Sequence, residues 1–220
     1  MKLPLSRCLL SVLITWWLLI STSFQYKVPL VQRPAPGPLG INLDWNLATL
    51  NAPPEDPSRP ARSWFLSSRI RFNQPVSSIT DGQLWQLVFD AHAEIGAALG
   101  QHGIGQRHMK IMTLTAFDHE IIFSSTLKGI AFVYDVGDTP VRDQLLLCQA
   151  EFHEETGFDD QHRNEGKCGE IMGAQLYYKA HPGTDISAIG ARMATVMPMA
   201  GTGGRVDRRA PCAEPRNDRV

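Results

Sequence analysis

The chain is 220 residues long, 43% of them apolar and 20% charged, with a formal net charge of −1 at pH 7. This length accommodates one domain of ordinary size together with an appendage. Because acidic and basic residues balance, no surplus of positive charge indicates nucleic acid or an anionic lipid surface as a partner. We therefore expect no nucleic-acid partner, and a membrane contact only through the N-terminal segment.

The N-terminus has the pattern of a secretory signal. An apolar run at 8–20 follows Lys2 and Arg7, and the small residues Ser21-Thr22-Ser23 come after it. Residues 1–24 are therefore predicted to be a signal peptide, and the protein to be secreted. The alternative is an uncleaved signal anchor, which would make a single-pass membrane protein. The run is shorter than the roughly 20 residues that cross a bilayer, although Thr22–Tyr26 would lengthen it.

Proline dominates the next segment. Nine of the fifteen prolines lie between residues 25 and 75. Proline fixes φ and removes a backbone donor, so regular structure is not expected there. We predict a stalk or wrapping arm over 25–78, in which Asn42–Leu50 and Trp64–Phe72 are short segments that pack onto the following domain.

Residues 79–220 have the pattern of an α/β domain. Thr80 precedes apolar residues that recur at helical spacing as far as Leu99, and glycines follow them, which predicts an amphipathic helix. Extended segments rich in Ile, Thr and Phe then predict a hairpin. After the first helix, we expect strands at 111–117 and 121–126, helices at 141–155 and 168–180, a strand at 188–197 and a loop at 199–209.

Two cysteines lie where helices are expected to begin. Cys168 follows a polar, glycine-containing loop and opens the predicted helix at 168–180. There, unpaired N–H groups and the positive end of the helix dipole would stabilise its thiolate. Pro211 would pre-set φ for a second helix start and place Cys212 in a similar setting. Glu170 would lie one step into the first of these helices.

This order of elements resembles the cytidine-deaminase-like superfamily, in particular its divergent, secreted fungal members. The resemblance covers about 140 of the 220 residues: a helix, a hairpin, a Cys-x-Glu helix, a strand and a Pro-Cys pair. It implies a three-layer α/β sandwich in which Cys168 and Cys212 hold Zn²⁺. It also implies that Glu170 shuttles protons while zinc-bound water deaminates a small-molecule substrate.

The sequence departs from that family in its second motif. The family pattern is Pro-Cys-x-x-Cys, whereas Cys212 is followed three residues later by Pro215. The closing strands and helices of the family are also missing, so the domain is expected to be C-terminally incomplete. A third zinc ligand would have to come from elsewhere, and the candidates are His162, His153 and Cys148.

A disulfide is the competing interpretation of the cysteines. Without Cys8, a mature chain would contain Cys148, Cys168 and Cys212, an odd number. In an oxidising compartment, Cys168 could pair with either of the others and leave one thiol over. The protein would then be a non-catalytic secreted or membrane-tethered module, such as an effector or an accessory protein of a biosynthetic pathway.

A second motif, His92-Ala93-Glu94, also resembles the His-x-Glu of deaminases. It lies inside the first predicted helix rather than at its start, and no Pro-Cys-x-x-Cys follows it. We therefore interpret His92 as a solvent-facing helical residue.

Overall fold

The structure is a computed structural model that describes residues 31–48, 63–105, 111–129, 139–157, 166–199 and 205–209. The predicted signal segment 1–24 and the Pro211-Cys212 pair lie outside the described residues. Within the described ranges, no helix has the length and apolar character that a membrane span requires. Residues 32–220 belong to one compact unit, whose described parts contain all the elements below.

An antiparallel sheet forms the centre of this unit. In the described residues it has six strands in the order β1-β2-β4-β3-β5-β6. The strands are β1 (Asn42–Leu43), β2 (Leu66–Arg71), β3 (Met112–Phe117), β4 (Glu120–Ser125), β5 (Arg192–Pro198) and β6 (Val206–Arg209). The helices are α2 (Trp45–Ala48), α3 (Asp81–Gln101), α4 (Val141–Thr156) and α5 (Gly169–Ala180), with 3-10 turns at Val76–Ser78 and Ile186–Ala188. The α/β class predicted from the sequence is confirmed in this form.

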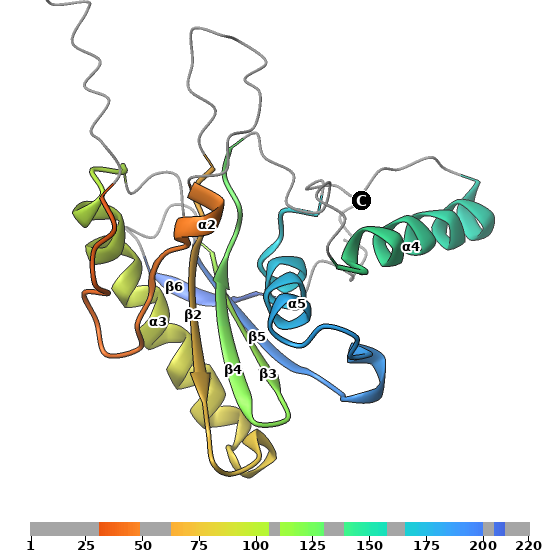
Figure 1. Cartoon of the computed structure of the whole chain (residues 1–220), viewed down its shortest axis with the longest axis horizontal. Coiled ribbons are helices and arrows are strands. Elements are labelled where there is room, and N and C mark those ends of the chain that lie inside the picture. The colour runs from red at the N-terminus through yellow and green to blue at the C-terminus, as the bar shows by residue number, and fades with distance from the viewer. Residues whose placement is uncertain are drawn as a thin grey trace, which may run out of the picture. The chain divides into compact units, whose positions relative to one another are not determined.

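Helices cover both faces of the sheet. α3 packs against β3 and β5, and α5 packs against β3 and β4 (Figure 1). Successive side chains of a strand point to opposite faces. Thr113 and Thr115 contact the α5 side, so Leu114 and its neighbours at even positions point to the α3 side. Because both faces are covered, every residue of β3 and β4 is buried.

The first long helix and the hairpin lie where their local sequences predict, with the strand bounds within one residue of those expected. Thr80 caps α3 through a capping box, in which its side chain accepts from the Gln83 N–H and its own N–H donates to the Gln83 side chain. The predicted apolar stripe is buried at Leu84, Val88 and Ile95. A two-residue turn joins β3 to β4, and Asp118 occupies it with a φ of 36°. Aspartate tolerates this left-handed region better than most residues.

β2 lies in the proline-rich segment, for which the composition predicts no regular structure. It lies between β1 and β4 in the sheet, with Ile70 opposite Ile121. The sequence predicts that Trp64–Phe72 packs onto the domain, and it does so as an inner strand rather than as an arm laid over the surface. Its sequence lacks the apolar–polar alternation of a half-buried strand, because polar residues lie on both faces. These residues are accommodated because they form hydrogen bonds with other segments, as Ser68 and Arg69 do.

The C-terminal strands differ from the prediction. β5 begins at Arg192, because a 3-10 turn and Gly190, with a φ of 67°, occupy the start of the predicted strand. The loop predicted at 199–209 is wrong at its end, where β6 pairs with β5. β6 is an edge strand with charged side chains, a composition that edge strands use against aggregation. Arg208 lies 4.6 Å from the centre of the Trp85 ring, which anchors it to α3.

The His92-Ala93-Glu94 motif has a structural role. Glu94 accepts hydrogen bonds from the backbone N–H groups of Leu39, at 2.8 Å, and Ile41, at 3.2 Å. It therefore fastens the segment before β1 to α3. His92 is half-buried rather than solvent-facing.

His102 gives the fold a pH dependence that can be measured. Burial, and secondarily the charge of Arg33, lower its pKa from the usual 6.5. The folded state therefore resists protonation of His102, whereas the unfolded chain accepts the proton. This contribution to stability is complete above pH 6.5 and is lost as the pH falls below it. In urea titrations between pH 7.5 and 5, the free energy of unfolding should fall less steeply with pH for His102→Gln than for wild type. Parallel curves would contradict the lowered pKa of His102.

Candidate functional site

Cys168 lies at the N-cap of α5, as the sequence predicts. Its φ and ψ of −69° and 152° are extended, and the helix starts at the next residue. Its carbonyl accepts the first helical hydrogen bond, from the Met172 N–H at 3.0 Å. The residue is 2% exposed. The thiol is therefore a buried group at the positive end of a helix, a setting that favours the thiolate electrostatically while burial opposes it.

Gly169 brings this end of α5 into contact with the hairpin. A Cβ at position 169 would lie 2.4 Å from Thr113 Oγ1 and 3.0 Å from the Ser124 carbonyl oxygen. The Ser124 hydroxyl donates to the Gly169 carbonyl at 2.8 Å. One turn later, a Cβ on Gly173 would lie 3.0 Å from Thr115 Oγ1. The residue between Cys168 and Glu170 therefore has to be glycine for the helix to approach the sheet this closely.

Glu170 extends toward β5. Thr195 Oγ1 lies 3.3 Å from Glu170 Oε1 and donates to it. Thr195 also shares a 3.0 Å hydrogen bond with Thr113 of the neighbouring strand. The hydroxyls therefore form a short polar chain from β3 to the carboxylate. Cys168 and Glu170 share one turn of α5, which is the placement that the sequence predicts for them.

The remaining predicted ligands do not join Cys168 in the part of the chain that the structure describes. Cys212 and His162 lie outside it. Cys148 and His153 are exposed on α4. Across the described ranges, no group of three or more His, Cys, Asp and Glu side chains is placed to hold a metal ion.

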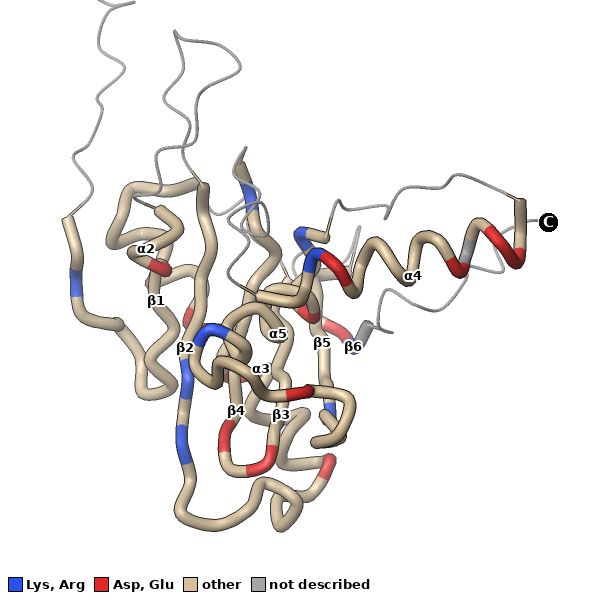
Figure 2. The backbone as a smooth tube through the Cα atoms, turned by 45° about the vertical axis from the view of Figure 1, so that its right-hand side comes forward, with Lys and Arg blue, Asp and Glu red and all other residues tan. Residues whose placement is uncertain are grey.

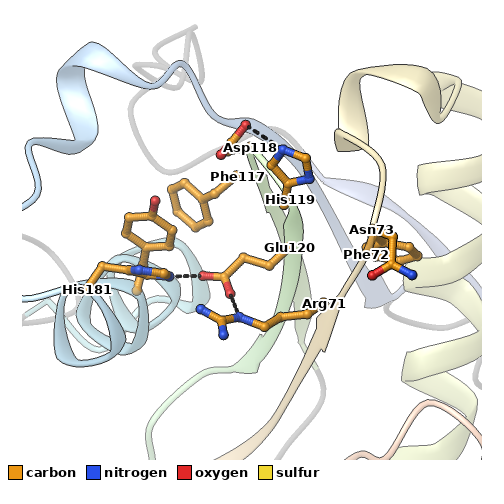
Figure 3. A pocket seen from close by; sticks show the side chains of 9 residues that line it. Arg71, Phe72, Asn73, Phe117, Asp118, His119, Glu120 and His181 are labelled. Carbon is orange, nitrogen blue, oxygen red and sulfur yellow. Dashed lines mark hydrogen bonds and ion pairs between the residues drawn. The ribbon is translucent and has the colours of Figure 1, made fainter.

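A pocket that the sequence analysis did not predict lies at the opposite end of α5. It has a volume of about 360 Å³ and opens beside the β3–β4 turn (Figure 3). The residues that line it come from the end of β2, the hairpin turn and the last turn of α5: Arg71, Phe72, Asn73, Phe117, Asp118, His119, Glu120, Tyr177 and His181. From Cys168 to His181 the helix rises about 20 Å, so the two regions are separate.

Glu120 is the centre of this pocket's polar network. Its side chain is only 4% exposed, and Oε2 accepts from Arg69, with 2.6 Å to both Nε and Nη2. Oε1 lies 2.8 Å from His181 Nε2. Arg71 is directly opposite Glu120 in the strand register, and its Nε is 3.4 Å from Oε2. The buried carboxylate of Glu120 is therefore paired with two arginines of β2 and with His181, the C-cap residue of α5.

Tyr177 and His181 form the α5 wall of the pocket. The Tyr177 ring stacks on Phe117, with centres 4.2 Å apart, and lies 4.5 Å from the His181 ring. Burial and the charges of Glu120 and Asp118 raise the pKa of Tyr177, against the opposing effect of Arg69. The phenol is therefore held in its neutral form and offers an O–H group.

Comparison of this chain with protein-family models, curated proteins and solved structures finds no match.

One sequence signal could have located the pocket. Glu120 begins a strand in which Ile122 and Ser124 share its face, and that face is buried. A charged residue at such a register needs a partner of opposite charge from another element. Two arginines spaced two apart, Arg69 and Arg71, fit that requirement, but their strand lies in the segment predicted to be an arm.

Proposed function

We propose that the N-terminal turn of α5 is the centre of a zinc-dependent, deaminase-like site, with Cys168 and Cys212 as ligands and Glu170 as the proton shuttle. The observation that carries the proposal is the position of Cys168 at the N-cap of α5, with Glu170 in the first turn beside the polar chain from Thr195. The substrate class is a small molecule with an exocyclic amine, which hydrolysis would release as ammonia.

The layering supports the finer fold assignment, a three-layer cytidine-deaminase-like sandwich. α3 covers one face, the β3–β4 hairpin follows it, and α5 crosses the other face before β5 pairs antiparallel with β3. This is the order of elements on which the resemblance rests. β6 fills part of the interval between β5 and Cys212, which accounts for the unusual length of that interval.

The residues of α5 and β5 suit the roles proposed for them. The positive end of the helix favours the thiolate of Cys168 over its neutral thiol, and the thiolate is the form that binds zinc. Zinc would supply Lewis acidity that lowers the pKa of a bound water to about 7. Glu170 would accept the proton from that water and pass it to the leaving amine. The Thr195 hydroxyl donates to Oε1 and so orients the carboxylate.

The proposal includes the secretory pathway. The predicted signal at 1–24 would deliver the domain outside the cell, or, if uncleaved, tether it to a membrane as a single-pass protein. The basis of this part is the charge and hydropathy pattern of the N-terminal sequence.

Zinc content tests the proposal directly. Elemental mass spectrometry of the full chain, purified without chelator, should find about one zinc per molecule. Cys168→Ser should lose it, whereas Cys148→Ser, at an exposed position on α4, should keep it. Glu170→Gln should keep the zinc and lose ammonia release from aminated substrates, because the glutamate is not a ligand. Activity unchanged in Glu170→Gln would show that the catalytic assignment is wrong.

The burial of Cys168 favours a second candidate, a non-catalytic module held by a disulfide. At 2% exposure, the sulfur is placed like that of a structural cysteine. A peptide map that recovers Cys168 linked to Cys212, in protein without zinc, would establish this alternative and exclude the metal site.

A further inference from the structure

We propose that the pocket beside the β3–β4 turn binds a small molecule carrying an oxyanion group, a phosphate or a carboxylate, through the guanidinium of Arg71. This site is separate from the proposed zinc site and does not depend on it. Figure 3 shows Arg71 beside Glu120, with Asp118 and His119 above them in that view.

Arg71 is held at one edge and open at the other. Its Nε donates to Glu120 Oε2 across 3.4 Å. Among the described residues, its two terminal nitrogens donate no hydrogen bond, and its side chain is 67% exposed. With Nε directed toward Glu120, the guanidinium has its terminal N–H groups available as a planar fork, which matches the two oxygens of a phosphate or carboxylate.

The charges of the network leave Arg71 in excess. Arg69 already forms a close pair with Glu120 at 2.6 Å, so the single negative charge of that carboxylate has a full partner. Arg71 adds a second positive charge on the same face of β2, since residues two apart in a strand share a face. Figure 2 shows these basic positions on β2 beside the acidic positions of the β3–β4 turn. An incoming anion would complete the pairing.

Asp118 is the acidic group that opposes an anion here. It is 63% exposed at the rim, 3.7 Å from His119 Nε2, so solvent screens much of its charge. Glu120, the other carboxylate that lines the pocket, is neutralised from behind by Arg69. The positive charge that faces the pocket is therefore that of Arg71. Asp118 opposes it in part, and a substitution of Asp118 can remove that opposition.

The rest of the lining indicates a ligand with an apolar body. Phe72 is half-buried in the pocket wall, and Phe117 and Tyr177 form the wall opposite the β2 end. Asn73 and His119 add polar groups that are exposed at the mouth. A volume of about 360 Å³ is at the small end of the range of ligand pockets. A single ring bearing an oxyanion is the size and chemistry that fit.

Calorimetric titration of the full chain with ring compounds tests the site. The probes are phenyl phosphate, benzoate and, as a neutral control, benzyl alcohol. Phenyl phosphate or benzoate should bind saturably, and the tighter of the two identifies the oxyanion. Arg71→Gln should weaken that binding about tenfold or more, as loss of a charge-assisted pair requires. Arg71→Lys should fall between, because it keeps the charge without the fork.

Two further variants make the test specific. Arg208→Gln, an exposed arginine on β6, should bind like wild type, and Asp118→Asn should bind about two- to threefold tighter because a repulsive charge is gone. Since Arg71 is largely exposed, its variants should melt like wild type. The proposal is overturned if benzyl alcohol binds as well as the anions, if Arg71→Gln and Arg208→Gln have equal effects, or if no anion saturates the protein below about 10 mM.

Discussion

Gly169→Ala is expected to lower the free energy of unfolding by about 1–3 kcal/mol, the usual range for an added carbon in a packed site. The new Cβ would meet Thr113 Oγ1 at 2.4 Å and Thr113 Cβ at 2.8 Å, and the backbone oxygen of Ser124 at 3.0 Å. The backbone oxygen cannot move aside by rotating a side chain, so α5 has to shift away from the hairpin. That shift would also stretch the hydrogen bond from Ser124 Oγ to the Gly169 carbonyl.

Urea denaturation followed by circular dichroism measures this effect, and two other helical glycines are matched controls. Gly173→Ala should change stability by less than about 1 kcal/mol, because its new carbon would meet two side-chain hydroxyls, Thr115 Oγ1 at 3.0 Å and Ser124 Oγ at 3.2 Å, and no backbone atom as close. Alanine also improves helix propensity. Gly100→Ala, whose new carbon would have no atom within 4 Å apart from its chain neighbours and the backbone of its own helix, should stabilise α3 by about 0.5–1 kcal/mol. Equal stability of Gly169→Ala and wild type would mean that α5 does not approach the sheet as described.

Glu120→Gln is expected to lower the free energy of unfolding by about 2–3 kcal/mol. The amide keeps one oxygen that can accept from Arg69. Its NH₂ group either faces an arginine, which is also a donor, or faces His181, which can accept at Nε2 only after its proton moves to Nδ1. Arg69 is 34% exposed and Arg71 67%, so the unpaired cations are partly solvated and the loss stays below that of a fully buried pair.

Glu151→Gln on α4 is the control for the charge change alone. Glu151 is exposed, and its substitution should change stability by less than about 0.5 kcal/mol. Because Glu120 is shielded from solvent, its effect should persist in 1 M salt, where surface ion pairs are screened. A loss that disappears in salt, or that matches the control, would contradict the description of Glu120 as a buried centre of this network.

Several features of the protein follow from local sequence alone. Thr80 and the apolar spacing behind it specify α3 and its buried face, since capping and helical periodicity act within a few residues. The same holds for the hairpin on either side of Asp118-His119, and for the start of α5 after Cys168. The placement of Cys168 and Glu170 on one helical turn is a consequence of that start, so this part of the candidate site could be predicted.

The second pocket could not be predicted in this way. It combines β2, the hairpin turn and the end of α5, and its residues are up to 110 positions apart, from Arg71 to His181. The strand that carries Arg69 and Arg71 has no clean alternation, because Arg69 on the α5 face and Ser68 on the α3 face both bind partners from distant segments. β6 escaped prediction for a similar reason, since its charged residues suit an edge strand as well as a loop.

Local sequence, then, determined the α/β class, the helices α3 and α5 that cover the sheet and the helix start at Cys168, because each depends on patterns within one stretch of chain. Tertiary structure alone decided that β2 is an inner strand, that Gly169 must lack a side chain, and that Glu120 meets two arginines and a histidine. Those outcomes depend on which distant segments share a face of the sheet and how closely they approach. Register and packing set both, and neither is encoded by a residue's neighbours in sequence.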